Sequence, residues 1–344
     1  MASAYELTRD ELTGLLAGEP KYRVDQIWQG IWEQDRFPEE ITTISKALRE
    51  KLTAELPLAL AVANDVSTDE GTTRKWVYRL HDGYTIETVL MNYEDRVTVC
   101  ISTQAGCAMG CTFCATGQAG FSRQLTLGEV VEQVVRAGRA AAPRRISNIV
   151  FMGMGEPLAN YDVTVGTIRA LHHERGLSAR NLTVSTVGIA PAIERLALEG
   201  LPLTLAISLH VANDAERDEL IPINKRYNLE RLYQACEVWR AETGRRISFE
   251  WALISGVNDT DQALYELAEY ARPLGAHVNL IPLNPTPGFL VIGSPAARVR
   301  YFRDELEELG VNATVRRTRG RTIDAACGQL ANVTNGKRRS IPVR

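Results

Sequence analysis

The 344-residue sequence has no low-complexity segment, no long apolar run and no strong excess of one charge. Without about eighteen consecutive apolar residues, no membrane-spanning helix is expected, and no apolar stretch follows a basic start as in a secretory signal. A net charge of -3 excludes a uniformly basic nucleic-acid-binding protein, because neutralising phosphates requires concentrated Lys and Arg. We therefore expect a soluble, cytoplasmic globular protein without a membrane partner.

Cysteine is also scarce, and its six copies do not form the framework of a small disulfide-rich domain. Three of them, Cys107, Cys111 and Cys114, follow a C-x3-C-x2-C spacing, with Phe113 directly before the last. A structural zinc site is closed by four ligands, whereas three thiolates on a four-iron cluster leave one iron open. The spacing therefore predicts an iron-sulfur centre that performs chemistry, and a zinc site without catalysis is the alternative.

Basic residues gather only in two short runs near the C-terminus, at residues 316–321 and 337–339. Short charge runs are most often solvated loops, so either run alone is weak evidence for nucleic-acid contact.

The first part of the chain has helical periodicity. One amphipathic stripe consists of Val24, Ile27, Trp28, Ile31 and Trp32. A second helix is predicted for residues 45–56, and the tryptophans are most simply core. The β-rich runs 74–80 and 85–91 flank Asp82-Gly83, which predicts a hairpin.

From about residue 96, strand-like runs alternate with helical patterns. The predicted strands are residues 96–102, 146–153, 182–186, 203–209, 247–253 and 278–283. Helix starts are predicted at Thr126, where Glu129 completes a capping box, at Asn228, and at Ser294 with Pro295 in the first helical position. Parallel strands need such crossovers, so the fold class is α/β, with a full or partial βα barrel.

Polar groups follow several of these strands, at the end where a βα barrel binds its ligands. They comprise Gly155 and Glu156, Ser185, the run Ser208-Leu209-His210, and Asn284. Each alone has a structural explanation, since Gly-Glu-Pro is a common turn and a single histidine is usually a satisfied core residue. Because such groups recur at the C-terminal ends of several strands, they favour a ligand site at this end of the barrel. The cysteine loop follows the first strand and is expected at the same end.

The cysteine spacing, followed by Gly155-Glu156-Pro157 after the next strand, resembles the radical S-adenosylmethionine (SAM) superfamily. Further strings narrow the resemblance to the RlmN family, and it covers nearly the whole chain. They are Glu87-Thr-Val, Cys100-Ile-Ser-Thr-Gln-Ala-Gly-Cys107, Ala206-Ile-Ser-Leu-His210, Ile221-Pro-Ile-Asn-Lys225 and Ile323-Asp-Ala-Ala-Cys-Gly-Gln-Leu330.

This resemblance implies a partial (β/α)6 TIM-type barrel with a small N-terminal helical domain and a β-hairpin extension. The expected segments are an RNA-binding-like helical domain (1–60), a linker and hairpin (61–95), the barrel (96–310) and a C-terminal segment with the methyl-carrying cysteine (311–344). It also implies a [4Fe-4S] cluster on Cys107, Cys111 and Cys114. The residues expected to contact SAM are Gly155, Glu156, Ser185, Ser208, Leu209, His210 and Asn284.

The activity implied by the resemblance is methylation of C2 of an adenine in 23S ribosomal RNA, and in part of the adenine beside the anticodon of certain tRNAs. Two SAM molecules are used per turnover: one methylates Cys327, and the second gives a radical that activates this methyl group. Glu87 is the implied base that removes the C2 proton. Cys100 then attacks the sulfur of Cys327, which releases the base and leaves a disulfide. Without the resemblance, the local sequence patterns favour other interpretations: a solvent-facing carboxylate for Glu87 and an ordinary buried strand cysteine for Cys100. Cys236 is interpreted as structural in either case.

The implied partners are ribosomal RNA that is free or not yet assembled, tRNA, and an electron donor of the flavodoxin or ferredoxin type, with the protein a monomer. Two other radical SAM functions stay open. One is the Cfr-type branch, which methylates C8 of adenine, although Pro157 and Thr318-Arg-Gly320 favour the C2 branch. The other is a substrate that is a protein or small molecule.

Overall fold

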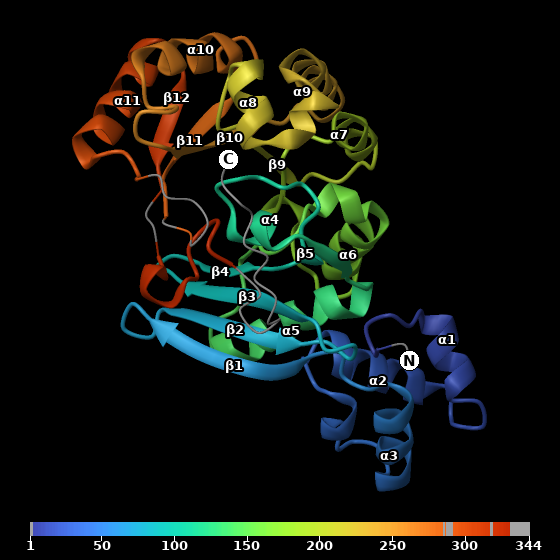
Figure 1. The fold of residues 1–344 in the computed structure, drawn as a ribbon. Helices are drawn as coiled ribbons and strands as arrows, with labels where there is room; N and C mark the ends of the chain where they lie inside the picture. The colour runs from blue at the N-terminus through green and yellow to red at the C-terminus, as the bar shows by residue number, and fades with distance from the viewer. Residues whose placement is uncertain (1–2, 285, 287–291, 317–318, 331–344) are drawn as a thin grey trace.

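The computed structural model describes residues 3–284, 286, 292–316 and 319–330 (Figure 1). Within these residues, one curved sheet of ten strands organises the molecule. Its strands, in spatial order, are β1 (Ala61–Thr68), β2 (Thr73–Arg79), β3 (Thr85–Asn92), β4 (Val97–Cys100), β7 (Asn148–Phe151), β8 (Leu182–Thr186), β9 (Thr204–Ser208), β10 (Ser248–Leu253), β11 (His277–Pro282) and β12 (Asn312–Val315). Strands β1 to β4 pair antiparallel, and β4 to β12 pair parallel.

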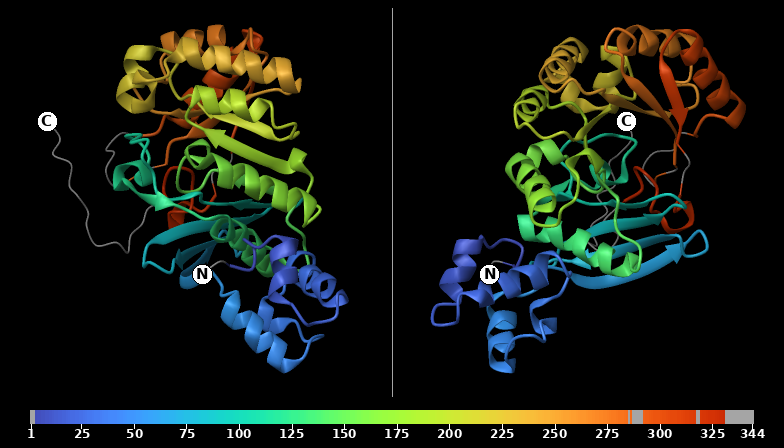
Figure 2. Two further views of the ribbon diagram at one scale, coloured as in Figure 1. Left: turned by 90° about the vertical axis from the view of Figure 1, so that its right-hand side faces the viewer. Right: turned by 180° about the vertical axis from the view of Figure 1, so that it is seen from behind.

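Helices connect the parallel strands and lie along the outer side of the curved sheet (Figures 1 and 2). They are α5 (Leu127–Ala141), α6 (Tyr161–His173), α7 (Ala190–Ala197), α8 (Asp214–Leu220), α9 (Leu229–Thr243), α10 (Asp261–Ala271) and α11 (Ala296–Glu308). The described part of the sheet leaves β1 and β12 as unjoined edges. This is the predicted α/β architecture of a partial barrel. None of the described helices has the length and apolar character needed to cross a membrane.

All six predicted parallel strands are present within a few residues of their expected bounds. The capping box of α5 is confirmed, because the Thr126 amide donates to Glu129 Oε2 (2.9 Å) and the Glu129 amide to Thr126 Oγ1 (3.3 Å). Asn228 likewise caps α9.

The predicted cap at Ser294 is wrong. Helix α11 starts one residue later than expected, with Pro295 at the N-cap, and Ser294 Oγ instead donates to Asp259 Oδ2 in the loop after β10.

The N-terminal module contains α1 (Arg9–Leu15), α2 (Tyr22–Trp32) and α3 (Lys46–Glu55) around a hydrophobic core of its own. The predicted stripe on α2 is confirmed, with Trp32 buried and Trp28 half-buried. This core extends to Val131 and Val135 of α5, and Trp28 Nε1 donates to Glu174 Oε2 at the end of α6 (2.7 Å). The module is therefore packed against the barrel helices.

Several short strands have no counterpart in the sequence prediction. Residues 61–68, expected as linker, form β1, which pairs with β2 of the predicted hairpin. Strand β12 adds a seventh parallel strand, and β5 (Gln104–Gly106) and β6 (Phe121–Gln124) pair around the cysteine loop. Strand β1 is largely exposed and β12 has only four residues, so neither carries the apolar alternation by which strands are found in a sequence.

Candidate active site

The three clustered cysteines lie on a loop between β5 and the short helix α4 (Ala115–Ala119). The loop is fixed at both ends, since the Cys107 amide donates to the Gly120 carbonyl (2.9 Å) and the Thr112 amide to the Leu220 carbonyl (3.1 Å). It also wraps closely around α4. A side chain at Gly117 would bring its Cβ to 2.8 Å from the backbone oxygen of Cys111, so this contact requires glycine.

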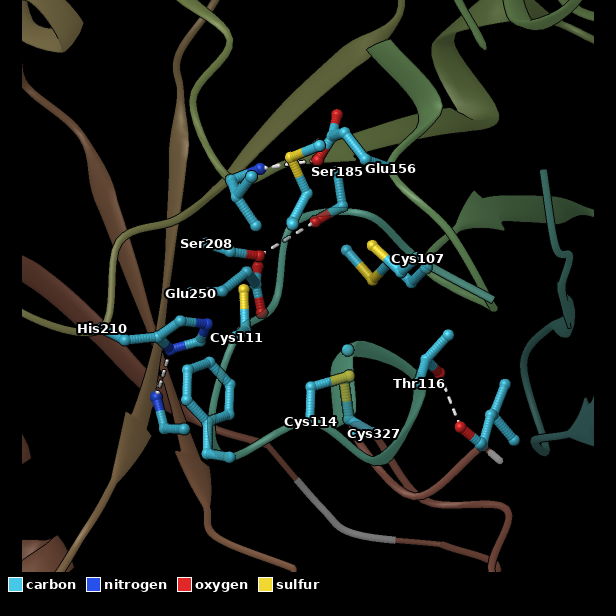
Figure 3. A pocket seen from close by; sticks show the side chains of 18 of the residues that line it. Cys107, Cys111, Cys114, Thr116, Glu156, Ser185, Ser208, His210, Glu250 and Cys327 are labelled. Carbon is cyan, nitrogen blue, oxygen red and sulfur yellow. Dashed lines mark hydrogen bonds between the residues drawn. The ribbon is translucent and has the colours of Figure 1, made fainter. Parts of the chain in front are cut away.

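Cys107, Cys111 and Cys114 all face one cavity of about 1050 Å³, a volume that includes its open mouth (Figure 3). Its other walls come from the carboxyl ends of the parallel strands, as the barrel rule predicts. The lining includes the predicted residues Gly155, Glu156, Ser185, Ser208, His210 and Asn284.

The Gly-Glu-Pro turn after β7 is held against the sheet by its glycine and its carboxylate. Gly155 has φ +103°, and a Cβ there would approach the Cβ of Gln104 to 2.5 Å. The Glu156 carboxylate accepts the amides of Leu158 and Val187, both at 2.9 Å. Burial raises the pKa of Glu156 to about 7. Because backbone donors already occupy this carboxylate, its first role is to set the shape of the loop.

The ends of β8 and β9 contribute two hydroxyls and an imidazole. Ser185 Oγ and Ser208 Oγ lie 3.5 Å apart. His210 has φ +55°, its Nδ1 accepts the Ala252 amide (2.9 Å), and its ring packs edge-on against Phe113. Burial lowers the pKa of His210 to about 3, so the ring is neutral and Nε2 carries the hydrogen.

Leu209 differs from its neighbours. Its side chain lies fully buried in the hydrophobic core and is absent from the cavity lining, so the expected contact between Leu209 and SAM stays a prediction that only the Leu209 backbone can fulfil. Leu209 directly follows the last residue of β9 and continues the strand alternation, so its side chain faces away from that of Ser208.

A second cavity adjoins the first, and Cys327, Asn284 and Arg316 line both. Cys100, at the end of β4, faces this second cavity.

The chain around Cys327 is held by hydrogen bonds to the cysteine-bearing region. The Ala115 amide donates to the Gly328 carbonyl (2.9 Å), Thr116 Oγ1 to the Leu330 carbonyl (2.5 Å) and Asn284 Nδ2 to the Cys327 carbonyl (3.2 Å). Cys327 thus lies between the three-thiol cavity and Cys100.

Both of these thiols have a raised pKa. Burial raises the pKa of Cys100 to about 12, and the neighbouring Cys327 adds to this shift. The Cys327 residue keeps exposed surface, and although the surrounding protein raises the pKa of its thiol, the Arg316 guanidinium opposes this shift. Arg316 lines both cavities, and its Nη1 lies 3.7 Å from Glu250 Oε2.

Glu87 lies on β3 with only 2% of its surface exposed, contrary to the solvent-facing position that its local pattern favours. The register pairs Val89 with Cys100, and side chains two residues apart share a face, so Glu87 lies on the same face of the sheet as Cys100. Glu87 Oε2 forms an ion pair with Lys75 Nζ (3.1 Å), which also donates to the carbonyl of Asp324. The C-terminal segment therefore covers this face.

Two buried charged residues near the cavity were missed by the sequence analysis. Glu250 lies in β10 and lines the first cavity, where Ser248 Oγ and Asn279 Nδ2 donate to its carboxylate. Arg217 of α8 is fully buried, and its guanidinium donates to the carbonyls of Val187, Ser208 and Leu209 at the ends of β8 and β9. The sequence could have identified Glu250, because it is a charged residue within an apolar strand. The sequence around Arg217 does not indicate that this residue is buried, because charged residues on short helices are usually exposed.

The donor set fits an iron-sulfur cluster. Cys107, Cys111 and Cys114 supply only sulfur, and within the described residues no three Cys, His, Asp or Glu side chains converge as the ligands of one metal ion. A four-iron cluster gives each thiolate its own iron, so three thiols spread around one cavity match it. Burial raises the pKa of Cys107 to about 12, so cluster binding must release this proton. The strand-end polar groups supply hydrogen-bond donors and acceptors to the same cavity as the three thiols.

Comparisons with known proteins agree with this geometry. Residues 101–268 match the Radical SAM superfamily. The chain is 50% identical over 327 residues to the Salinispora tropica protein named "Probable dual-specificity RNA methyltransferase RlmN", covering 91% of this chain and 88% of that protein. It is 46% identical over 350 residues to "Dual-specificity RNA methyltransferase RlmN 1" of Myxococcus xanthus, covering 99% and 98%.

A solved structure shares the complete fold. The crystal structure of a radical SAM methyltransferase from Sphaerobacter thermophilus superimposes with a TM-score of 0.93 at 48% sequence identity, covering 96% of this chain and 99% of that one. The identity, the coverage and the shared fold leave one assignment: the chain belongs to the RlmN family of radical SAM methyltransferases.

Proposed function

We propose that this enzyme methylates C2 of an adenine in 23S ribosomal RNA and of the adenine beside the anticodon of some tRNAs. The observation that carries the proposal is the position of Cys327, which lines both the three-thiol cavity and the cavity that contains Cys100. A methyl-carrying residue must receive its group at one site and deliver it at another. The names of the relatives, which describe dual-specificity RNA methyltransferases, support the choice of substrate.

Cys107, Cys111 and Cys114 would hold the [4Fe-4S] cluster, and Glu156, Ser185, Ser208, His210 and Asn284 would surround SAM. When bound, the cluster and two successive SAM molecules would supply the methyl group, the radical that activates it and an acceptor for the one electron that the adduct loses. A radical route is needed because C2 lies between two ring nitrogens, so this electron-poor carbon cannot attack the methyl group of SAM.

The chain's own residues carry the remaining steps. The Cys327 sulfur accepts the methyl group and, after loss of one hydrogen, its methylene carbon adds to C2. Glu87 removes the proton from C2. The Cys100 thiolate then attacks the Cys327 sulfur, the sulfur-carbon bond breaks, and the released carbon takes up a proton to become the methyl group. An external donor reduces the resulting Cys100–Cys327 disulfide. We further propose a cytoplasmic monomer that acts on RNA before ribosome assembly and uses a flavodoxin-type or ferredoxin-type donor.

The decisive experiment is nucleoside mass spectrometry of ribosomal and transfer RNA from a deletion strain with and without this protein. The proposal expects 2-methyladenosine to appear only with the protein, in one or both RNA classes. The appearance of 8-methyladenosine instead would assign the chain to the C8 branch. Unmodified RNA would favour a radical SAM enzyme with a protein or small-molecule substrate.

A second measurement addresses the zinc alternative. Anaerobically purified protein should contain roughly four irons and matching sulfide per chain, as one [4Fe-4S] cluster requires. Bound zinc without iron or sulfide would contradict the proposed cofactor.

A further inference from the structure

Tyr93 in the wall of the second cavity stacks with two arginines, of which one, Arg319, also lines the cavity. The guanidinium carbons of Arg96 and Arg319 lie 4.0 and 4.3 Å from the centre of the Tyr93 ring. Tyr93 and Arg319 line the same cavity as Cys100 and Cys327. The stack therefore lies beside the two thiols between which the methylated base would be released.

Arg319 is held in place through one nitrogen. Its Nη1 donates to Thr72 Oγ1 and to the Asn92 carbonyl, both at 3.0 Å. Among the residues that the structure describes, no carboxylate forms an ion pair with Arg319. A guanidinium has five N–H donors in a planar fork, so the bonds at Nη1 leave the edge with Nε and Nη2 for a ligand.

The other two arginines nearby each have a carboxylate partner. Arg316 lies 3.7 Å from the Glu250 carboxylate, and Arg96 forms an ion pair with Asp95 (3.0 Å). Arg319 therefore carries the uncompensated positive charge of this cavity wall. Because guanidinium groups already stack on the Tyr93 ring, this ring is not available to stack on an RNA base. The group that remains for a ligand is the Arg319 guanidinium, which is planar and positively charged. That combination matches a phosphodiester.

We propose that the Arg319 guanidinium binds a phosphodiester of the RNA segment whose adenosine enters the second cavity. This inference rests on the proposed function, because a base that reaches Cys327 brings its own backbone to the cavity wall. Tyr93 then acts as a positioning residue that holds the guanidinium toward the ligand. In the competing explanation, Arg319 only ties the C-terminal segment to the loops around β2 and β3.

The test uses the full chain and a synthetic RNA hairpin that the wild-type protein methylates. Arg319→Gln should weaken RNA binding about tenfold and lower the slope of log affinity against log salt by about 0.7, the value for one contact to single-stranded RNA. Arg319→Lys should keep most of the slope but regain only part of the affinity, because it lacks the fork. Arg195→Gln on α7 is the matched control and should change both quantities little, because Arg195 also stacks on a tyrosine, Tyr161, and pairs with Asp162, but lines neither cavity.

A neutral methylphosphonate placed at single linkages around the target adenosine identifies the partner. At one linkage it should weaken wild-type binding about tenfold and leave Arg319→Gln binding unchanged. Equal losses in both proteins at every linkage would overturn the inference, even if the variant is less stable. Failure of the proposed function would look different, since the wild-type protein would then methylate no RNA hairpin at all.

Discussion

The Glu156 carboxylate joins two neighbouring strand ends, because its Oε2 accepts the backbone amide of Val187 at 2.9 Å. Its other oxygen accepts the Leu158 amide, and the Glu156 amide itself donates to Gln104 Oε1 at 2.8 Å. The carboxylate and the backbone amide of Glu156 together connect the loop after β7, the end of β8 and the strand that leads into the cysteine loop. The proposed SAM walls and cluster loop are parts of one hydrogen-bonded unit.

Glu156→Gln should therefore weaken SAM binding without unfolding the protein. An amide side chain has one acceptor oxygen, so it leaves either the Val187 or the Leu158 amide without its partner. Losing one hydrogen bond to a charged group costs about 1.5–3 kcal/mol, which corresponds to roughly a 10-fold to 150-fold loss of affinity. Calorimetric titration of the anaerobic, cluster-loaded enzyme with SAM measures this change. Glu269→Gln on the exposed face of α10 is the control, and wild-type affinity in the Glu156 variant would refute the positioning role.

Arg217→Met should destabilise the fold strongly. The fully buried guanidinium donates to three strand-end carbonyls and to Asn224 Oδ1 (2.8 Å), so its removal leaves several buried acceptors unpaired. Breaking such a network costs about 3–5 kcal/mol in the free energy of unfolding, measured by urea denaturation of the cluster-free protein.

Arg195→Met provides the comparison, since that side chain is 59% exposed and its ion pair with Asp162 contributes under about 1 kcal/mol. Equal losses in both variants would contradict this account.

The strand ends of the site could be predicted because their order in the sequence fixes their place in space. Parallel strands joined by helices bring Glu156, Ser185, Ser208 and Asn284 to one edge of the sheet, whatever their distances in the chain. Strand alternation also separates Ser208 from Leu209, so the inward and outward residues of a run could have been sorted from the sequence alone.

Other parts of the site depend on contacts that no local pattern records. Glu87 is buried because a segment more than two hundred residues later covers its strand, through Lys75 and the carbonyl of Asp324. Arg217 is buried because its short helix packs onto the ends of β8 and β9. Residues 337–339, considered above as a basic patch, lie outside the described residues, as do residues 317 and 318 of the other patch.

The shared cavity of Cys100 and Cys327 makes the two cysteines separable by experiment. Cys327→Ala should abolish methyl transfer to RNA, because the methyl group has no carrier. Cys100→Ala should accumulate a covalent protein–RNA adduct, because no thiol frees the Cys327 sulfur. Denaturing gels of turnover mixtures with labelled RNA detect the adduct. Cys236→Ala, which alters a core cysteine of α9, should do neither. An absence of adduct in the Cys100 variant would contradict its proposed resolving role.

His210 should make the cluster-free protein sensitive to acid. Burial lowers its pKa to about 3, whereas an unfolded chain has the ordinary value near 6.5. The folded state therefore binds fewer protons below pH 6.5, so this contribution to stability is complete above pH 6.5 and is lost as the pH falls toward 3. The slope is about 1.4 kcal/mol per pH unit, or roughly 2–3 kcal/mol between pH 6.5 and 4.5.

His210→Asn removes this titration and suits the positive φ of the site, which asparagine tolerates. At pH 7.5 the variant should be less stable than the wild type, since the ring contact with Phe113 is lost. The difference in unfolding free energy should shrink by about 2–3 kcal/mol on going to pH 4.5, because only the wild type pays the protonation penalty there. Urea denaturation at each pH measures it, with exposed His173→Asn as the control. A difference that stays constant with pH would mean that His210 is protonated in the folded protein.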